Sequence, residues 1–189
     1  MFINNTIILG VDPGTNILGY AIIKTESPTP RVLKMDVLNS SACKNYYEKL
    51  GKIHGEINEI INLYKPSFLA IEAPFYGKNV QSMLKLGRAQ GIVIATAMFH
   101  KIPVIEYSPK KIKLAITGNG NSSKEQVWKM LAQIFNLEHK PEFMDASDAL
   151  AIALCHYYNG SSTIEKIQKR KTTDWKSFIN QNPQLLTKK

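Results

Sequence analysis

The sequence has few cysteines and no long apolar run, and each shortage excludes a class of protein. Its 189 residues include only Cys43 and Cys155, too few for a disulfide framework, so we expect a reducing compartment. No stretch approaches the roughly 18 apolar residues that a membrane-spanning helix needs. Residues 1–6 lack a cationic segment followed by an apolar stretch, so we expect no signal peptide there. These features favour a cytoplasmic protein with no membrane partner.

Acidic residues are also scarce relative to basic ones. The chain has 15 Asp and Glu against 24 Lys and Arg, a formal net charge of +9 at pH 7. This excess favours a polyanionic partner, with nucleic acid ahead of an anionic membrane surface. Residues 160–189 carry seven of the Lys and Arg against two acids. We therefore predict a folded domain over residues 1–159, followed at 160–189 by a basic tail or a short appended helix.

The hydrophobic pattern predicts an α/β fold. Short apolar segments between turn-forming residues predict strands at residues 7–11, 18–24, 32–39, 67–71 and 104–107. Apolar residues at three- and four-residue spacing predict helices at residues 46–64 and 79–99 and two more that begin near 123 and 145. Because short turns join the first three strands, we expect them to be antiparallel neighbours. The order predicts a mixed sheet with helices packed on it.

Four acidic residues lie where an ionised side chain is costly. Asp12 and Glu72 each end a predicted strand, and the carboxyl ends of parallel neighbours meet at one edge of a sheet. Asp145 and Asp148 are three residues apart, on one face of a predicted helix. Burying such charges costs roughly several kcal/mol unless a cation compensates, and no Lys or Arg is adjacent in the sequence. A divalent cation is the natural candidate.

Each of these residues also has an ordinary structural explanation. Asp12 lies in an Asp-Pro-Gly turn, where Asp often bonds nearby backbone amides, and Glu72 could face water at a strand end. Asp145 could cap its helix, and Asp148 could be a favourable charge in the first turn. We favour the metal site because capping explains neither Asp12 nor Glu72. Clustered carboxylates also favour protonation unless cations bind.

A basic segment follows the last predicted strand. Residues 108–124 contain Lys110, Lys111, Lys113 and Lys124 and no acidic residue. The amide-rich stretch 118–123 leads into a helix amino terminus, where anions bind readily. The segment could be a solvated linker. Beside a carboxylate–metal cluster, it could instead contact backbone phosphates.

An aromatic pair and two glycines each allow two interpretations. Phe75 and Tyr76 directly follow the Glu72 strand and could fill a small core or stack on an unpaired base. Gly87 and Gly91 lie in the apolar stripe of the helix at 79–99, where each costs about 1 kcal/mol relative to Ala. Close approach of another backbone would compensate. That backbone could be the chain's own sheet or the matching helix of a second subunit.

Four segments together resemble RuvC, the family of bacterial Holliday junction resolvases with a ribonuclease H-like fold. They match in the family's order and approximate spacing over most of residues 7–158, and the ordered set is more specific than any single segment. The segments are ILGVDPGTNILGYAII, LAIEAPFYGKNVQSMLKLGRAQG, SPKKIKLAITGNGNSSKEQV and DASDALAIALCHYY. The resemblance implies a mixed five-stranded sheet flanked by helices, with the nuclease domain at residues 1–159.

The resemblance assigns a catalytic and metal-binding role to the four acidic residues. They would be the family's active-site quartet, Asp12, Glu72, Asp145 and Asp148. Some members carry histidine at the position of Asp145.

The resemblance also implies a set of DNA-binding residues. Lys113 and Lys124 match basic residues that approach junction DNA, and Phe75 matches an aromatic that stacks near the exchange point. Lys110 and Lys111 share the basic segment, and we include them as candidates.

The family acts as a homodimer with magnesium or manganese and cooperates with the RuvA–RuvB branch-migration complex. We therefore expect a metal-dependent endonuclease with two ions per subunit. It would resolve four-way DNA junctions by paired symmetric nicks in homologous recombination and repair, leaving 5′-phosphate ends.

Two other functions remain open. A non-catalytic junction-binding protein would keep the fold and the basic face. An actin/hexokinase-type phosphotransferase fragment is less favoured. Gly-Val-Asp-Pro-Gly-Thr resembles that group's first phosphate loop, but the group has a duplicated second half for which 189 residues leave no room.

Overall fold

The computed structural model describes residues 5–26, 29–74 and 79–170, and for residues 161–170 the backbone alone. Its strands are β1 (Ile7–Asp12), β2 (Ile17–Lys24), β3 (Arg31–Asn39), β4 (Phe68–Glu72) and β5 (Val104–Tyr107). Its helices are α1 (Tyr46–Tyr64), α2 (Val80–Phe99), α3 (Pro109–Thr117), α4 (Lys124–Phe135) and α5 (Met144–Arg170). The predicted strands and the four predicted helices are confirmed. Helix α3 was not predicted.

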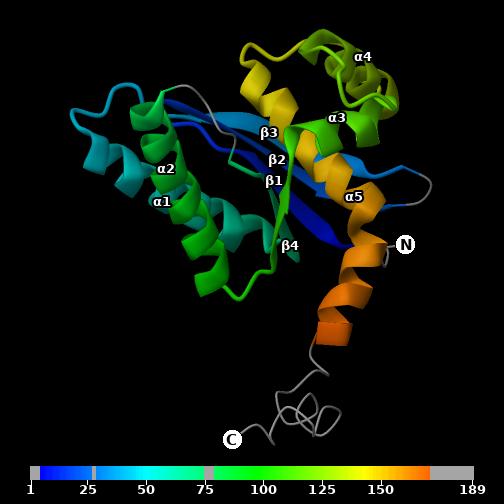
Figure 1. The fold of residues 1–189 in the computed structure, drawn as a ribbon, viewed down its shortest axis with the longest axis horizontal. Helices are drawn as coiled ribbons and strands as arrows, with labels where there is room; N and C mark the ends of the chain where they lie inside the picture. Colours follow the sequence, from blue (N-terminus) through cyan, green and yellow to red (C-terminus); the bar gives the residue numbers. More distant parts are fainter. Residues whose placement is uncertain (1–4, 27–28, 75–78, 171–189) are drawn as a thin grey trace, which may run out of the picture.

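The strands form one mixed sheet, as expected. Their order is β3-β2-β1-β4-β5, with β1, β2 and β3 antiparallel and β1, β4 and β5 parallel. Alternate side chains of each strand enter two separate cores. Leu9 and Ile71 pack under α1 and α2, whereas Ile8 and Tyr107 pack under α3, α4 and α5. Figure 1 shows the two helical layers on either side of the sheet.

Helix α5 lies unusually close to the sheet because two strand residues lack side chains. A Cβ atom built on Gly10 would lie 2.3 Å from the carbonyl oxygen of Ala149, and one on Gly19 would lie 1.9 Å from that of Asp145. The helix residues between Ala149 and Cys155 are buried on every side. This contact fixes the first turns of α5 over the carboxyl end of β1.

Helix α2 has the opposite character. Its buried face contains Ala89, Val93 and Ala97, whereas the apolar stripe read from the sequence faces outward. Apart from the backbone of α2 itself, no described atom lies within 4 Å of a Cβ added to Gly87 or Gly91. The interpretation that the chain's own sheet covers these glycines is therefore wrong.

Helix α5 continues to Arg170, across the predicted boundary between residues 159 and 160. The division into a domain and a tail stays a prediction, and residues 171–189 lie outside the described part of the chain. Among the described residues, no helix has the length and apolar character needed to cross a bilayer.

Candidate active site

Two strand ends bring Asp12 and Glu72 together. Strands β1 and β4 are parallel neighbours with Val11 opposite Ile71, so the acidic residue that follows each lies at the same edge of the sheet. The carboxylates border a cavity of about 270 Å³. Its lining comes from β1, β4, α3, α4 and α5, and comprises Asp12, Glu72, Pro109, Ile112, Lys113, Lys124, Val127, Asp148 and Ala151.

The acidic residues act on one another across this cavity. Burial first, then the charges of Glu72, Asp148 and Asp145, raise the pKa of Asp12 from 3.8 to about 8. Burial and the Asp148 carboxylate also raise the pKa of Glu72. Asp145 does not line the cavity, but its charge reaches Asp12. Asp12, Glu72 and Asp148 thus line one cavity, and Asp145 acts on Asp12 from outside it; the catalytic and metal-binding role of the four residues stays a prediction.

Lys124 brings a positive charge into the cluster. Its Nζ lies 2.5 Å from Oδ2 of Asp148, whose side chain is 18% exposed. Burial lowers the pKa of the Lys124 ammonium, but the hydrogen bond to Asp148 and the charges of Asp148, Asp12 and Asp145 outweigh burial and raise it. The sequence argument, which looked only at neighbouring residues, did not anticipate this pair.

The start of α4 explains where Lys124 sits. Ser123 caps the helix: its side chain accepts a hydrogen bond from the Gln126 backbone N–H, and the Gln126 side chain accepts one from the Ser123 N–H. Lys124 is therefore the first residue of a fixed helix, 24 residues before Asp148.

The donor set fits a divalent cation. Lys113 and Lys124 line the cavity against three carboxylates, with Asp145 acting from nearby, so acidic groups outnumber basic ones. Carboxylate oxygens are the ligands that hard cations prefer. Among the described side chains, those of residues 5–26, 29–74 and 79–160, no three His, Cys, Asp or Glu lie close enough together to hold one ion. The carboxylates thus surround the cavity from several sides instead of meeting at one point.

A family model described as "Crossover junction endodeoxyribonuclease RuvC" matches residues 8–156, which include all four acidic residues. The chain belongs to the RuvC family. The curated RuvC of Christiangramia forsetii is 51% identical over 177 residues, 94% of this chain and 91% of that protein. The RuvC of Bacteroides fragilis is 49% identical over 185 residues, 96% of each chain. The resemblance read from the sequence is confirmed.

A solved structure supports the fold of the RuvC family for this chain. It is described as T. thermophilus RuvC in complex with Holliday junction substrate, and it is 31% identical with a TM-score of 0.77. The match covers 82% of this chain and 94% of that chain. The expected ribonuclease H-like sheet flanked by helices is therefore confirmed.

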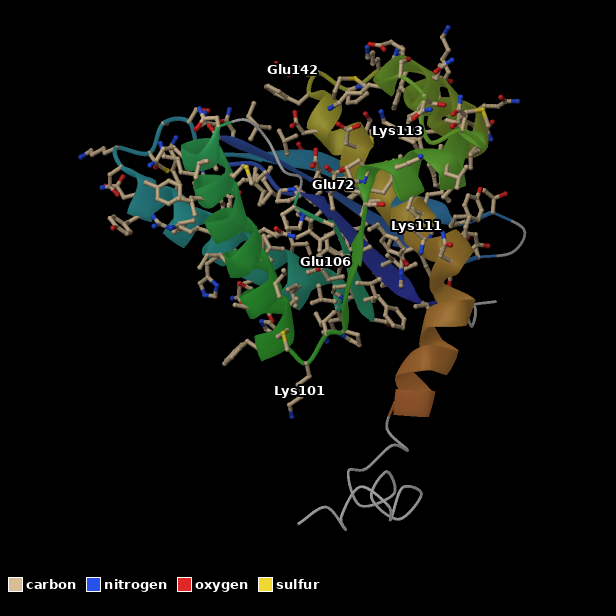
Figure 2. All side chains as sticks on the ribbon, viewed as in Figure 1. Glu72, Lys101, Glu106, Lys111, Lys113 and Glu142 are labelled. Carbon is tan, nitrogen blue, oxygen red and sulfur yellow. The ribbon has the colours of Figure 1, made fainter. Side chains whose placement is uncertain are left out.

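The structure separates Lys111 from Lys110 and Lys113, which share one hollow; a DNA-binding role stays a prediction for each of them. Lys113, on α3, lines the cavity, and Figure 2 shows it at the same end of the sheet as Glu72. Lys110 lines a neighbouring hollow with Gly120. Lys111 lies elsewhere, with Nζ 4.9 Å from the centre of the Tyr107 ring. Its DNA-binding role stays a prediction, as does that of Phe75, which lies outside the described residues.

The sequence argument missed one residue that holds Glu72 in place. The buried Gln90 side chain, on α2, donates one hydrogen bond to the Glu72 carbonyl oxygen at 3.1 Å and another to Oε1 of Glu106 at 2.9 Å. Its amide thus ties the end of β4 to the neighbouring strand. Gln90 could have been found as a polar residue next to Ala89, on the face of α2 that packs against the sheet. The sequence pattern pointed to the other face of this helix as the buried one.

Proposed function

We propose that this RuvC-family protein is a metal-dependent endonuclease that resolves four-way DNA junctions by paired symmetric nicks. The observation that carries the proposal is the convergence of Asp12, Glu72 and Asp148 on one cavity, in a chain that matches the family model over residues 8–156. Its place would be homologous recombination and repair in the cytoplasm, with the RuvA–RuvB complex as partner.

The RuvC family depends on a divalent metal ion. We infer that Mg²⁺ serves here, with Mn²⁺ as a substitute and two ions per subunit. Asp12, Glu72, Asp145 and Asp148 would hold them. When bound, such ions offset phosphate charge and make water a stronger nucleophile. The raised pKa of Asp12 supports this assignment, because an ionised carboxylate there needs a compensating cation.

The lysines around the cavity would position the DNA. The Lys113 and Lys124 side chains line the same hollow as the carboxylates, so their ammonium groups can bind phosphates beside the scissile bond. Lys124 would exchange its contact with Asp148 for a phosphate oxygen. Replacing either lysine with Ala should weaken binding and flatten its dependence on salt.

A homodimer would supply the second nick. The outward face of α2 exposes Val80, Leu84 and Met98, and it also contains the two uncovered glycines. Pairing of this face with the same face of a second subunit would bury apolar surface and allow close helix contact. Two-fold symmetry would then place two equal cavities on opposite strands.

The direct test uses a labelled synthetic four-way junction with Mg²⁺ or Mn²⁺. Asp12→Asn and Glu72→Gln should each lower the cleavage rate at least about a thousandfold and leave junction binding largely intact. Glu59→Gln is the matched control, because Glu59 is an exposed residue of α1 and does not line the cavity. Cleavage at the wild-type rate by Asp12→Asn or by Glu72→Gln would contradict the assignment.

The same assay distinguishes the other candidates. Tight junction binding without cleavage in either metal would select the non-catalytic junction-binding protein. For Phe75, replacement with Ala should impair cleavage more than binding to the junction arms, because an aromatic ring that stacks on an unpaired base acts at the exchange point.

A further inference from the structure

A second hollow, which we call the basic groove, opens beside the active-site cavity and begins two residues beyond Asp12. Its volume is about 660 Å³. It lies between the β1–β2 turn, the start of α1 and the first turns of α2. Figure 1 shows that α1 and α2 begin at the same end of the molecule. Its lining comprises Gly14, Thr15, Asn16, Cys43, Lys44, Asn45, Tyr46, Lys49, Ser82, Lys85 and Leu86.

The charge of the basic groove has one sign. Lys44, Lys49 and Lys85 line it, and no lining residue is acidic. None of these lysines forms an ion pair with a described residue. Glu48, on the first turn of α1, uses its carboxylate to accept hydrogen bonds from the Lys44 backbone N–H and the Asn45 side chain. The groove therefore presents uncompensated positive charge.

Hydrogen bonds hold the walls of the basic groove together. Lys49 Nζ donates to the side-chain oxygen of Asn16, which joins α1 to the β1–β2 turn. Tyr46 donates its hydroxyl hydrogen to the Lys85 carbonyl oxygen at 2.5 Å, which joins α1 to α2. Lys49 on α1 and Lys85 on α2 are thus mounted on elements fixed to one another, and Lys44 lies two residues before α1, so the fold sets the spacing of their charges.

We infer that the basic groove binds backbone phosphates of the DNA strand that passes over Asp12. This inference rests on the proposed function. The carboxylates repel a polyanion, and Lys113 and Lys124 offset that repulsion from the α3–α4 side only. The groove adds positive charge on the other side, next to the turn that carries Asp12. DNA bound across both would be held on each flank of the acidic cavity.

The basic groove is separate from the proposed dimer face. Lys85 and Ser82 line the groove toward α1, whereas Leu84, Gly87 and Gly91 lie on the outward face of the same helix. A second subunit packed on the outward face would leave the groove open to DNA.

The test removes two groove charges and measures salt dependence. Lys44→Gln/Lys85→Gln is made in the uncleaving Glu72→Gln protein, and its affinity for a fluorescent four-way junction is measured from 50 to 300 mM salt. Each lost phosphate contact should reduce the slope of log K against log salt concentration by about 0.9. The slope of the double variant should therefore be smaller by about two. The same relation predicts roughly tenfold weaker binding per lysine at 0.1 M salt.

The matched control removes two charges from the far ends of the same helices. Lys65→Gln/Lys101→Gln should change the slope by less than about 0.5, because these exposed lysines follow the last turns of α1 and α2. Figure 2 shows Lys101 at the end of the molecule opposite the cavity. Equal slope changes in the two double variants, or none in the groove variant, would overturn the inference.

Two further readouts separate this inference from the proposed function. In the cleaving protein, the groove variant should raise KM and leave kcat within about twofold, because its lysines do not border the cavity. A kcat that falls as far as kcat/KM would contradict a positioning role. Failure of the parent protein to prefer the junction over linear duplex would contradict the proposed function itself. Tight binding with no groove effect would contradict this inference alone.

Discussion

Helices α5 and α2 cross opposite faces of the same sheet, and each is associated with a pair of glycines. At Gly10 and Gly19, the backbone of α5 lies where a Cβ atom would have to be. At Gly87 and Gly91, on α2, nothing in the described chain approaches. The first pair is used within the chain to place Asp145 and Asp148 over β1. The second leaves a bare apolar surface.

The difference shows that one residue type can meet two structural needs. Gly10 and Gly19 occupy strands, where close helix packing compensates for the missing side chain. Gly87 and Gly91 weaken a helix without compensation among the described residues. The proposed second subunit would supply that compensation, so in the proposal the α5 side completes the active site and the α2 side pairs the two sites.

The largest expected effect is that alanine substitutions at the two glycine pairs change the free energy of unfolding in opposite directions. Gly10→Ala places a Cβ 2.3 Å from a backbone oxygen of α5, so it should lower the free energy of unfolding by about 1–3 kcal/mol or more. Gly87→Ala adds a methyl group in open space and should raise it by roughly 0.5–1 kcal/mol in the monomer. Urea unfolding of dilute protein measures both values. An equal decrease in the free energy of unfolding for both variants would contradict the difference between the two glycine pairs.

A charge on the outward face of α2 tests the subunit contact. Leu84 is 53% exposed, and Leu84→Glu should weaken association at least tenfold, about 1.4 kcal/mol, because it places a carboxylate between two apolar faces. Sedimentation equilibrium measures the change. Leu63→Glu, at a more exposed position on α1 (73%), is the control. Association that is insensitive to Leu84→Glu would place the dimer contact elsewhere.

The burial of Asp12, on the α5 side of the sheet, predicts that the stability of the metal-free protein depends on pH. Its folded-state pKa near 8 lies above the ordinary 3.8, so the folded protein keeps a proton that the unfolded chain releases between these values. Stability from this group is therefore full below about pH 4 and lost as the pH rises to about 8. In metal-free protein, the wild type should lose stability relative to Asp12→Asn over that range. Parallel pH profiles for the two proteins would disprove the shift.

The smallest expected effect compares one hydrogen bond on each side. The Tyr107 hydroxyl bonds Nδ1 of the buried His156 on α5 at 2.8 Å, and Tyr107→Phe should cost about 1–2 kcal/mol. Tyr46→Phe removes the partly exposed bond to Lys85 near the start of α2 and should cost less than about 0.5 kcal/mol. Thermal unfolding of both variants measures the difference. A larger loss of stability for Tyr46→Phe than for Tyr107→Phe would contradict this prediction.

Local patterns predicted most of the fold. Strand ends, turn residues and three- and four-residue spacing are properties of neighbouring residues, so the sequence located Asp12, Glu72 and the start of α5. Helix α3 was missed because its buried residues are only Ile112 and Ile116, which are too few to show a helical period among the lysines at 110, 111 and 113. Pro109, the first residue of this helix, was compatible with a helix start but did not require one.

The rest depended on contacts between distant residues. The Lys124–Asp148 pair joins two helices, and the two hydrogen bonds of Gln90 join a helix to two strands. No pattern of neighbours encodes such contacts. The spacing on α2 correctly found an apolar stripe, but a single chain's sequence does not tell an inner stripe from an outer one.

Binding of Mn²⁺ tests most directly whether the acidic residues form one metal site. Electron paramagnetic resonance measures free Mn²⁺ during titration into wild-type protein, Asp12→Asn and the Glu59→Gln control. Wild type and control should bind the ion with equal affinity, and Asp12→Asn should bind it at least about tenfold more weakly. Equal affinity in all three proteins would contradict the account.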